Sequence, residues 1–242
     1  MILAAIRSGA TYIAVSVYVL FAASVGMLLE MIFRWKGVLY ILGHGGVRLG
    51  LALAGIKVRV AGKENIPRDR AAVYCANHQS NVDPPVLFTA LHPRMHIVYK
   101  AEINAIPLLA RAFQHGGFVP IDRRNKEAAM RSLEAGARSI KAGNSFLIFP
   151  EGTRSKTAEM LPFKKGGFLM ALKAQAPIVP VAISGGRDAM QKGSKIIRPV
   201  DITIRVGAPI ETAGMQMSDR DALIARVRER IEALLAEGPV VD

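Results

Sequence analysis

The segment 77–83, with the sequence NHQSNVD, contains a histidine and an aspartate five residues apart. At this spacing His78 and Asp83 can meet across a tight turn or the first turn of a helix, with the carboxylate accepting a hydrogen bond from one ring nitrogen. The other ring nitrogen is then unprotonated and can take a proton from a substrate. The spacing therefore predicts a general base, although HXXXXD alone also fits a loop histidine without a catalytic role.

The residues on either side of this segment predict the elements that position it. The apolar run 71–76 has the length and composition of a buried strand, and Pro84 can begin a short helix over 84–91. Open α/β sheets carry their reactive groups at the carboxyl ends of strands. We therefore expect His78 in a turn at a strand end, stabilised by the short polar side chains around it.

Three more polar clusters follow predicted strands. They are Lys100 after the strand 96–99, residues 122–124 after the strand 116–121, and residues 151–154 after the strand 145–149. In the last cluster, the proline and glycine of FPEGTR predict a sharp turn with backbone N–H groups available to an anion. An arginine fork matches phosphate oxygens, and a lysine adds a point charge. These clusters are expected to share one sheet edge with His78, although EGTR alone also fits a solvated loop.

The remaining pattern alternates strands with helices. Strands are predicted at 57–61, 178–183 and 201–206, and helices at 103–113, 126–142, 166–175 and 219–236. The first of these strands alternates apolar and charged residues, as an exposed or edge strand does. Ser218 is the expected cap of the last helix. This alternation predicts an α/β domain with a largely parallel or mixed sheet.

The chain is strongly basic, with a formal net charge of +13 over 242 residues and a sequence pI of about 10.2. This length suffices for one sizeable domain with an appendage. The charge favours nucleic acid, a phospholipid membrane or a phosphorylated small molecule as partner. Nucleic acid is disfavoured because only 6% of residues are aromatic and none cluster with the basic groups. The candidates for general attraction to lipid or to donor phosphates are Lys173, Arg187, Lys192, Lys195 and Arg198.

The first 56 residues are strongly apolar and carry a net charge of only +3. Residues 9–29 form an uncharged run of 21 residues, and a helix of that length extends roughly 30 Å, the thickness of a hydrocarbon core. A second, glycine-rich apolar segment at 37–56 is interrupted by His44 and Arg48, which fits a helix in the membrane interface. One span, two spans and a monotopic hairpin all remain open. A cleaved signal peptide is disfavoured by the length of the first run, and a pair of soluble core helices by its lack of a polar face.

Other catalytic chemistries lack their residue patterns. The single cysteine, Cys75, lies in a predicted strand and cannot form an intrachain disulfide or a multi-cysteine metal site. No GXSXG elbow exposes a serine nucleophile. A metal hydrolase using His78, Asp83 and Glu151 would need paired histidine or aspartate ligands, whose spacing does not occur. No metal is therefore expected.

Four motifs in order, NHQSNVD, GFVPIDRRN, FPEGTRS and VPVAISG, together resemble those of the lysophosphatidic acid acyltransferase family, the 1-acyl-sn-glycerol-3-phosphate O-acyltransferases of bacterial type. The resemblance covers about residues 73–185, and the apolar N-terminal region is also similar to bacterial members. It implies the glycerolipid acyltransferase fold, a mixed central sheet flanked by helices, with an N-terminal hydrophobic helical membrane segment. The implied domains are membrane-anchoring helices at 1–56 and a catalytic α/β domain at 57–242.

The same resemblance implies roles for individual residues. His78 and Asp83 match the catalytic HXXXXD pair. The implied substrate-binding residues are Lys100, Arg123, Glu151, Gly152, Thr153 and Arg154. We expect Glu151 to orient Arg154 or the acceptor. Backbone N–H groups of residues 77–83, which we call the histidine loop, or of residues 151–153 are expected to form an oxyanion hole.

The implied reaction transfers a fatty acyl group from an acyl thioester, either acyl-CoA or acyl carrier protein, to the sn-2 hydroxyl of lysophosphatidic acid in phospholipid biosynthesis. No cofactor beyond this cosubstrate is expected. The implied location is the bacterial inner membrane, with the catalytic domain on the cytoplasmic face. Two alternatives stay open: an acceptor that is another lysolipid, such as a lyso-ornithine lipid, and a non-catalytic membrane-anchored module that binds anionic lipid.

Overall fold

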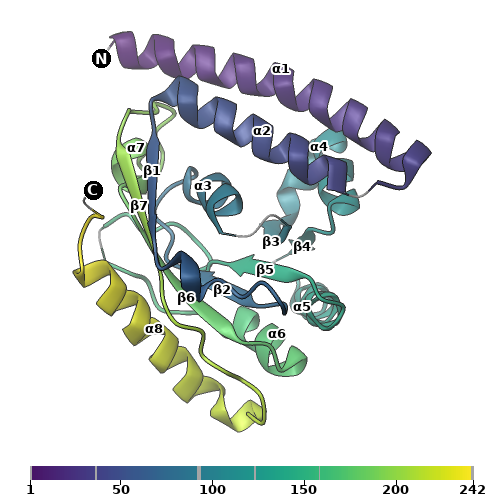
Figure 1. The fold of residues 1–242 in the computed structure, drawn as a ribbon, viewed down its shortest axis with the longest axis vertical. Helices are drawn as coiled ribbons and strands as arrows, with labels where there is room; N and C mark the ends of the chain where they lie inside the picture. The colour runs from purple at the N-terminus through teal and green to yellow at the C-terminus, as the bar shows by residue number, and fades with distance from the viewer. Residues whose placement is uncertain (1, 36, 92–93, 123, 158, 241–242) are drawn as a thin grey trace.

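A seven-stranded sheet forms the centre of the molecule in a computed structural model that describes residues 2–35, 37–91, 94–122, 124–157 and 159–240 (Figure 1). The strand order is β1-β7-β6-β2-β5-β3-β4. The strands are β1 (Lys57–Ala61), β2 (Val73–Ala76), β3 (Met95–Lys100), β4 (Val119–Ile121), β5 (Ser145–Ile148), β6 (Ile178–Ser184) and β7 (Asp201–Val206). Every strand predicted from the sequence is therefore present.

Most of the sheet is parallel. β2 pairs in parallel with β5 and β6, and β3 pairs in parallel with β5 and β4. β7 runs antiparallel to β6 and parallel to β1, which forms one edge of the sheet as its alternating sequence predicted. The sheet is therefore mixed, as expected, and the carboxyl ends of β2, β3, β4, β5 and β6 lie at the same edge.

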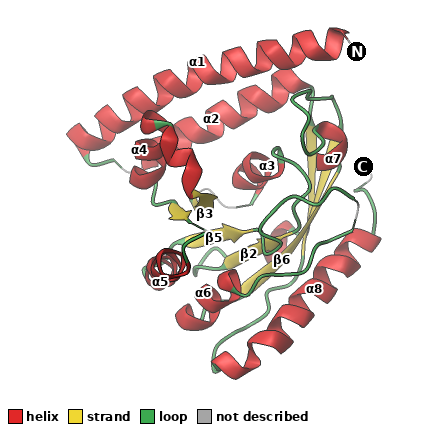
Figure 2. Ribbon diagram, turned by 180° about the vertical axis from the view of Figure 1, so that it is seen from behind, coloured by secondary structure: helices red, strands yellow, loops and turns green. Residues whose placement is uncertain are grey.

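Helices cover both faces of the sheet (Figures 1 and 2). In the α/β domain they are α3 (Asp83–Ala90), α4 (Pro107–His115), α5 (Lys126–Lys141), α6 (Gly166–Ala174), α7 (Gly186–Ala189) and α8 (Arg220–Ala236). Alternate residues of β2 face opposite layers, since Tyr74 packs in the core cluster with α3, whereas Cys75 packs in the cluster with α5, α6 and α8. Every residue of β2 is buried, which explains the continuous apolar run in its sequence.

Two apolar helices, α1 (Ile2–Phe33) and α2 (Gly37–Ala54), lie side by side as a hairpin over α3 and α4 (Figure 1). Glycine permits this close approach, because a Cβ at Gly46 would lie 2.9 Å from carbons of the Tyr18 ring. Both helices are long and apolar enough to cross a membrane. In the most apolar 18-residue stretch of each helix, only 17% of α1 and 22% of α2 is buried, whereas a core helix of a soluble protein is mostly buried. The hairpin therefore favours membrane association over a pair of soluble core helices.

The predicted helix over 103–113 differs from the structure. A 3-10 turn at Ala101–Ala105 precedes α4, which starts at Pro107. Proline disfavours helical geometry in the residue before it, and Ile106 is accordingly extended, with φ −104° and ψ 94°. Apolar residues at helical spacing continue across this break, which is why the sequence pattern alone did not reveal it.

The start of the last helix also differs from its prediction. Ser218 does not cap α8, which begins at Arg220 and has no side-chain cap among the residues that the structure describes. Instead, Gln216 and Asp219 form a capping box at the 3-10 turn Met217–Asp219, and the Gln216 N–H donates to Oδ2 of Asp219 at 2.7 Å. The capping expected of Ser218 is therefore provided by Gln216 and Asp219.

The stability of the fold is expected to fall between pH 6.5 and pH 4 because of His96. Burial in β3 lowers the pKa of His96 from its ordinary value of 6.5 to about 4. In this interval the unfolded chain binds a proton at His96 and the folded chain does not, so acidification favours unfolding. The loss should approach about 3 kcal/mol at pH 4, measured as the free energy of unfolding of the detergent-solubilised protein in urea.

A His96→Phe variant isolates this effect, because it keeps an aromatic ring against Phe146 and removes the titration. Other groups also titrate in this interval, so the difference between the two proteins reports on His96. The free energy of unfolding of the variant should fall less than that of the wild type. An equal fall in both proteins would assign the pH dependence to other groups.

Candidate active site

His78 and Asp83 are in contact. Nδ1 of His78 lies 3.0 Å from Oδ2 of Asp83, as the spacing of the two residues predicted. Asp83 is fully buried, whereas 15% of the His78 side chain is exposed. The same carboxylate oxygen also accepts hydrogen bonds from the backbone N–H groups of Gln79 and Ser80, each at 2.7 Å. The carboxylate is therefore a fixed anion that holds one edge of the imidazole ring.

The position of Asp83 follows from its place in the chain. It is the first residue of α3, so its carboxylate lies at the positive end of the helix dipole. Pro84 and Pro85 follow and have no N–H groups to offer, so the preceding loop supplies the donors. Gly186, at the start of α7, packs against the other carboxylate oxygen, since a Cβ there would lie 2.1 Å from Oδ1 of Asp83. Only glycine fits here without displacing the carboxylate, and sequence reasoning did not single out Gly186.

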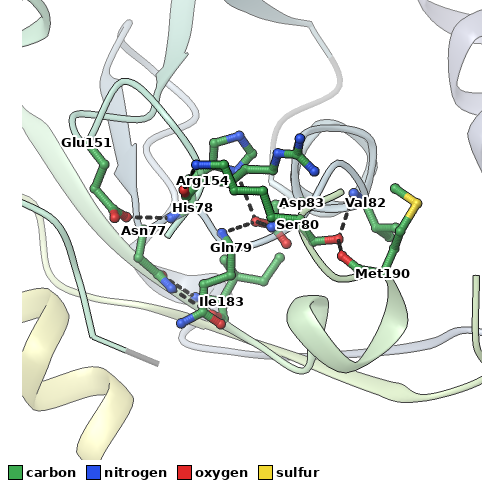
Figure 3. A network of polar contacts seen from close by, with 11 residues as sticks. Asn77, His78, Gln79, Ser80, Val82, Asp83, Glu151, Arg154, Ile183 and Met190 are labelled. Atoms are coloured by element: carbon green, nitrogen blue, oxygen red, sulfur yellow. Dashed lines mark hydrogen bonds and ion pairs between the residues drawn. The ribbon is translucent and has the colours of Figure 1, made fainter. Parts of the chain in front are cut away.

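Buried polar side chains hold the histidine loop on the sheet (Figure 3). The Asn77 amide accepts from the Ile183 N–H at 2.8 Å and donates to the Ile183 carbonyl at 2.9 Å. The Ser80 hydroxyl donates to the Met190 carbonyl at 2.8 Å. Asn77 and Ser80 are themselves fully buried. These bonds connect the loop to β6 and to the segment after it, so the position of His78 depends on distant parts of the sequence.

The second nitrogen of the imidazole is available to a substrate. Nε2 of His78 makes no hydrogen bond with any residue that the structure describes. The ring stacks on Phe149, with centroids 4.1 Å apart and planes inclined by 28°. Phe149 thus fixes the plane of the ring while Asp83 fixes its rotation. A proton on Nδ1 leaves Nε2 as a proton acceptor.

The carboxylate of Glu151 bonds to the histidine loop and not to Arg154. Its Oε1 accepts the His78 N–H at 2.7 Å, and its Oε2 accepts the Leu161 N–H at 2.9 Å. Burial raises the pKa of Glu151, and these two hydrogen bonds act in the opposite direction. Glu151 is only 2% exposed and both of its oxygens are occupied, so it positions the backbone of His78. This geometry differs from the expectation that Glu151 orients Arg154 or the acceptor.

Residues 149–154, which we call the EGTR turn, pack against the histidine loop. Gly152 has a φ of +70°, a conformation that favours glycine, and its N–H donates to the Phe149 carbonyl at 3.0 Å. The Ser155 N–H donates to the His78 carbonyl at 2.9 Å. A hydrogen bond therefore joins the turn that follows β5 to the loop that follows β2, as the shared sheet edge predicted.

Arg154 has unused hydrogen-bond donors. Its Nη1 atom is buried and has no partner among the described residues. The backbone N–H groups of Thr153 and Arg154 likewise make no hydrogen bond within the described chain. Figure 3 shows Arg154 in the same part of the site as His78 and Asp83. Charged and backbone donors without internal partners are the groups that bind an anion.

Two lysines outside the four motifs flank the EGTR turn. A Cβ on Gly152 would lie 2.9 Å from Cδ and Cε and 3.0 Å from Nζ of Lys164, so this side chain crosses the turn. Nζ of Lys192 donates to the Thr153 hydroxyl at 3.2 Å and to the Arg154 carbonyl at 2.7 Å. Within the described ranges, no carboxylate lies at ion-pair distance from Arg154, Lys164 or Lys192. These three cations therefore lie near one another without a carboxylate partner in the described part of the chain.

The other expected substrate-binding residues are less closely associated with this turn. Lys100 ends β3 at the same sheet edge, but its side chain is 58% exposed and pairs with Glu102 at 2.9 Å. Among the hydrogen bonds and ion pairs of the described residues, none joins Lys100 to His78 or Arg154. Arg123 lies outside the described residues, and its role stays a prediction.

A cavity of about 560 Å³ lies between the apolar hairpin and the α/β domain. Its walls come mainly from apolar residues of α1, α2, α3 and α4. The histidine loop and the first turn of α3 also line it, through Asn81, Val82, Pro84 and Pro85. The loop that carries His78 and Asp83 therefore adjoins a large apolar space, which no sequence pattern indicated.

Cys75 is not available as a nucleophile. It lies in β2, fully buried. Burial, with a smaller contribution from Glu151, raises the pKa of the Cys75 thiol, so the reactive thiolate does not form at neutral pH.

Comparisons with known proteins agree with one another. Residues 57–184 match the family model named Acyltransferase. The chain is 30% identical over 223 residues to a 1-acyl-sn-glycerol-3-phosphate acyltransferase of Limnanthes douglasii, covering 90% of this chain and 79% of that protein. It is 32% identical over 186 residues to 1-acyl-sn-glycerol-3-phosphate acyltransferase alpha of Homo sapiens, covering 76% and 66%. The fold matches the crystal structure of the acyltransferase PlsC from Thermotoga maritima, with a TM-score of 0.85 and 24% identity over 99% of both chains.

Proposed function

Because the chain belongs to the Acyltransferase family, we propose that it transfers a fatty acyl group from an acyl thioester to the sn-2 hydroxyl of lysophosphatidic acid, forming phosphatidic acid. The names of its relatives as 1-acyl-sn-glycerol-3-phosphate acyltransferases support this reaction. The observation that carries the proposal is the His78–Asp83 contact next to the EGTR turn, because a general base there adjoins donors for a phosphate. The proposed thioester donor is acyl-CoA or acyl carrier protein, and no further cofactor is proposed.

His78 acts as the general base in this reaction. Its Nε2 takes the proton of the acceptor hydroxyl while the hydroxyl oxygen attacks the thioester carbonyl, and Asp83 stabilises the resulting imidazolium. The carbon–sulfur bond then breaks, the imidazolium protonates the leaving thiolate, and the new ester remains. A thioester is already activated, so no covalent acyl-enzyme is required. General base catalysis of this kind contributes about 10²- to 10⁴-fold.

The oxyanion that forms on the thioester carbonyl needs hydrogen-bond donors. Five N–H groups of the histidine loop are already bonded within the protein, those of His78, Gln79, Ser80, Val82 and Asp83. The Asn81 N–H makes no hydrogen bond within the described chain. Asn81 is therefore our candidate for the oxyanion donor in this loop.

The phosphate of the acceptor binds at the EGTR turn in this proposal. Nη1 of Arg154 and the Thr153 N–H lack partners within the described chain, and the Lys164 ammonium crosses the turn. A phosphate monoester carries up to two negative charges and several acceptor oxygens, so it matches this set of donors. The same groups would be left unpaired by an acceptor that lacks a phosphate.

An acyl chain is proposed to occupy the apolar cavity beside the catalytic loop. Its volume of about 560 Å³ falls within the range of about 300–1,000 Å³ common for small-molecule sites. Each buried methylene group contributes about 0.8 kcal/mol. An apolar cavity of this volume therefore binds the chain, and side chains that reduce the volume shorten the chain that it accepts.

A Gly43→Leu variant is expected to shift the products towards shorter acyl chains. Gly43 lines the cavity from α2, and a Cβ there would meet the Phe88 ring at 3.5 Å, an ordinary contact. The leucine side chain should therefore occupy cavity space without displacing the helix. Losing room for two methylene groups costs about 1.6 kcal/mol, or roughly tenfold in the ratio of long-chain to short-chain product. Product masses from a mixture of acyl donors measure this ratio.

Ala52→Leu is the matched control, because it adds the same side chain at an exposed position of α2. Its product distribution should equal that of the wild type. If Gly43→Leu also leaves the distribution unchanged, the acyl chain does not occupy this cavity.

The proposed location is the bacterial inner membrane, with the catalytic domain on the cytoplasmic face. The exposed apolar side chains of the hairpin support it, among them Ile13, Val17, Phe21, Met31 and Phe33. A lysophospholipid acceptor lies in the bilayer, whereas the thioester donor arrives from the cytoplasm. The domain after the hairpin carries most of the positive charge, which attracts anionic lipid.

Purified protein, a set of labelled acyl-CoA and acyl carrier protein donors, and a set of lysolipid acceptors test the proposed reaction. The mass of the lipid product identifies both substrates. We expect the highest kcat/KM with lysophosphatidic acid. A higher kcat/KM with an acceptor that lacks a phosphate monoester, such as a lyso-ornithine lipid, would replace the proposed acceptor.

A further inference from the structure

The segment 186–197, between β6 and β7, touches both halves of the proposed site. Gly186 packs against the carboxylate of Asp83, as described above. The Met190 carbonyl accepts the Ser80 hydroxyl at 2.8 Å. Nζ of Lys192 contacts the EGTR turn through the two hydrogen bonds already given. One segment of the chain therefore joins the catalytic pair to the residues proposed to bind the acceptor.

The far end of this segment is fastened to α1. The Ser8 hydroxyl accepts the Ile197 N–H at 2.8 Å, and Ser8 is only 2% exposed. The Tyr12 hydroxyl donates to the Lys195 carbonyl at 3.0 Å. Lys192 thus lies between Met190 and Lys195, whose carbonyls both accept hydrogen bonds from other parts of the chain. Its ammonium is therefore held in place more firmly than that of an isolated surface lysine.

The bonding of Lys192 differs from that of the other basic residues in this segment. Its side chain is half-buried, and its ammonium donates to a carbonyl and a hydroxyl of the turn, with no carboxylate at ion-pair distance among the described residues. Lys195, by contrast, is exposed. Lys192 therefore adds positive charge at the turn that already presents Arg154. An anionic ligand would relieve the mutual repulsion of these cations.

We propose that Lys192 is a positioning residue for the acceptor. It holds the Arg154 carbonyl and the Thr153 hydroxyl, and so fixes the conformation in which the turn presents its donors to the acceptor phosphate. This inference rests on the proposed function, and it adds a residue from outside the four motifs to the acceptor site.

A Lys192→Gln variant should raise the KM for lysophosphatidic acid about tenfold, the loss typical of one hydrogen bond from a charged group. Lys192 does not contact His78 or Asp83, so kcat and the KM for the acyl donor should stay within about twofold of wild type. Initial rates over a matrix of donor and acceptor concentrations separate these constants. An equal rise in both KM values would contradict a role of Lys192 that is specific to the acceptor.

Two further variants make the effect specific. Lys195→Gln removes the same charge from the same segment and should leave the KM for the acceptor unchanged. Lys192→Arg keeps a cationic donor, so its KM for the acceptor should rise by no more than half as much as that of Lys192→Gln. If Lys195→Gln raises the acceptor KM as much as Lys192→Gln, the effect is long-range attraction and the proposal is wrong.

A double-mutant cycle with Arg154→Ala tests whether Lys192 acts through the turn. If Lys192 positions Arg154, then Lys192→Gln should change the acceptor KM by less than about twofold once Arg154 is absent. The same tenfold rise in both backgrounds would show that Lys192 binds the phosphate independently, which overturns a positioning role. A wild-type protein that forms no diacyl product would overturn the proposed function and this inference with it. Wild-type turnover with an unchanged acceptor KM in Lys192→Gln would overturn this inference alone.

Discussion

A His78→Ala variant is expected to lose turnover while it still binds the acceptor. It lacks the group that takes the proton of the acceptor hydroxyl, so kcat should fall by about 10²- to 10⁴-fold. The EGTR turn, with Arg154, is unchanged, so the dissociation constant for lysophosphatidic acid should stay within about threefold of wild type. Initial rates at saturating donor give kcat, and equilibrium binding to the protein in micelles gives the dissociation constant.

His115→Ala is the matched control, because it removes an exposed imidazole of α4 that pairs with Glu30 outside the site. Its kcat should stay near that of the wild type. A non-catalytic lipid-binding module would show no difference between the two variants. Wild-type turnover in His78→Ala would therefore exclude His78 as the general base.

Gly186→Ala is expected to lower kcat by about 10²-fold, although residue 186 takes no part in the chemistry. The added methyl carbon would lie 2.1 Å from Oδ1 of Asp83, well inside van der Waals contact. Asp83 is fully buried and its other oxygen is held by three donors, so the carboxylate must move and take the imidazole of His78 with it. A shift of about 1 Å in a catalytic group costs about 10²-fold in rate. The rate at saturating concentrations of both substrates measures the effect.

Gly9→Ala serves as the control, since an added Cβ there meets nothing within 4 Å. Its kcat should equal that of the wild type. Circular dichroism should show the same helix content in both variants, which separates a displaced carboxylate from a loss of fold. Full activity in Gly186→Ala would mean that the position of Asp83 is not critical to the reaction.

The sequence predicted the parts of the site that depend on local order along the chain. His78 and Asp83 are close in sequence and joined by one turn, so their contact followed from their spacing. The EGTR turn follows β5, the neighbour of β2 in the sheet, and polar residues at parallel strand ends must share an edge. The fold class and the two apolar N-terminal segments followed in the same way from hydrophobic periodicity and from composition, whereas the hairpin was one of three arrangements that the sequence left open. Their catalytic and binding roles stay predictions until activity is measured.

The parts that were missed depend on long-range packing. Gly186 and Lys192 reach the site because β6 lies beside β2, a pairing of strands far apart in the sequence. Lys192 had the same status in the sequence as Lys195, and only the fold distinguishes them. Phe149 was assigned to a strand, and its stacking on the imidazole requires the final geometry of two loops.

Glu151 shows a different limit of sequence reasoning. A carboxylate three residues from an arginine suggests an ion pair. Glu151 is buried, however, and its two oxygens accept hydrogen bonds from the backbone N–H groups of His78 and Leu161. The apolar cavity was also unforeseen, because it forms between the hairpin and α3 and belongs to no single element. Both features arise from how the layers pack.

The most direct test measures released thiol and lipid product in one reaction of the purified protein with an acyl thioester and lysophosphatidic acid. Direct transfer from the thioester to the acceptor hydroxyl predicts one phosphatidic acid for each thiol released, with the new ester at the sn-2 position, and both products formed about 10²- to 10⁴-fold more slowly in His78→Ala. Thiol release with free fatty acid but no new lipid would identify a hydrolase. Binding of lysophosphatidic acid without release of thiol would contradict the account, because it would leave the His78–Asp83 pair without a reaction.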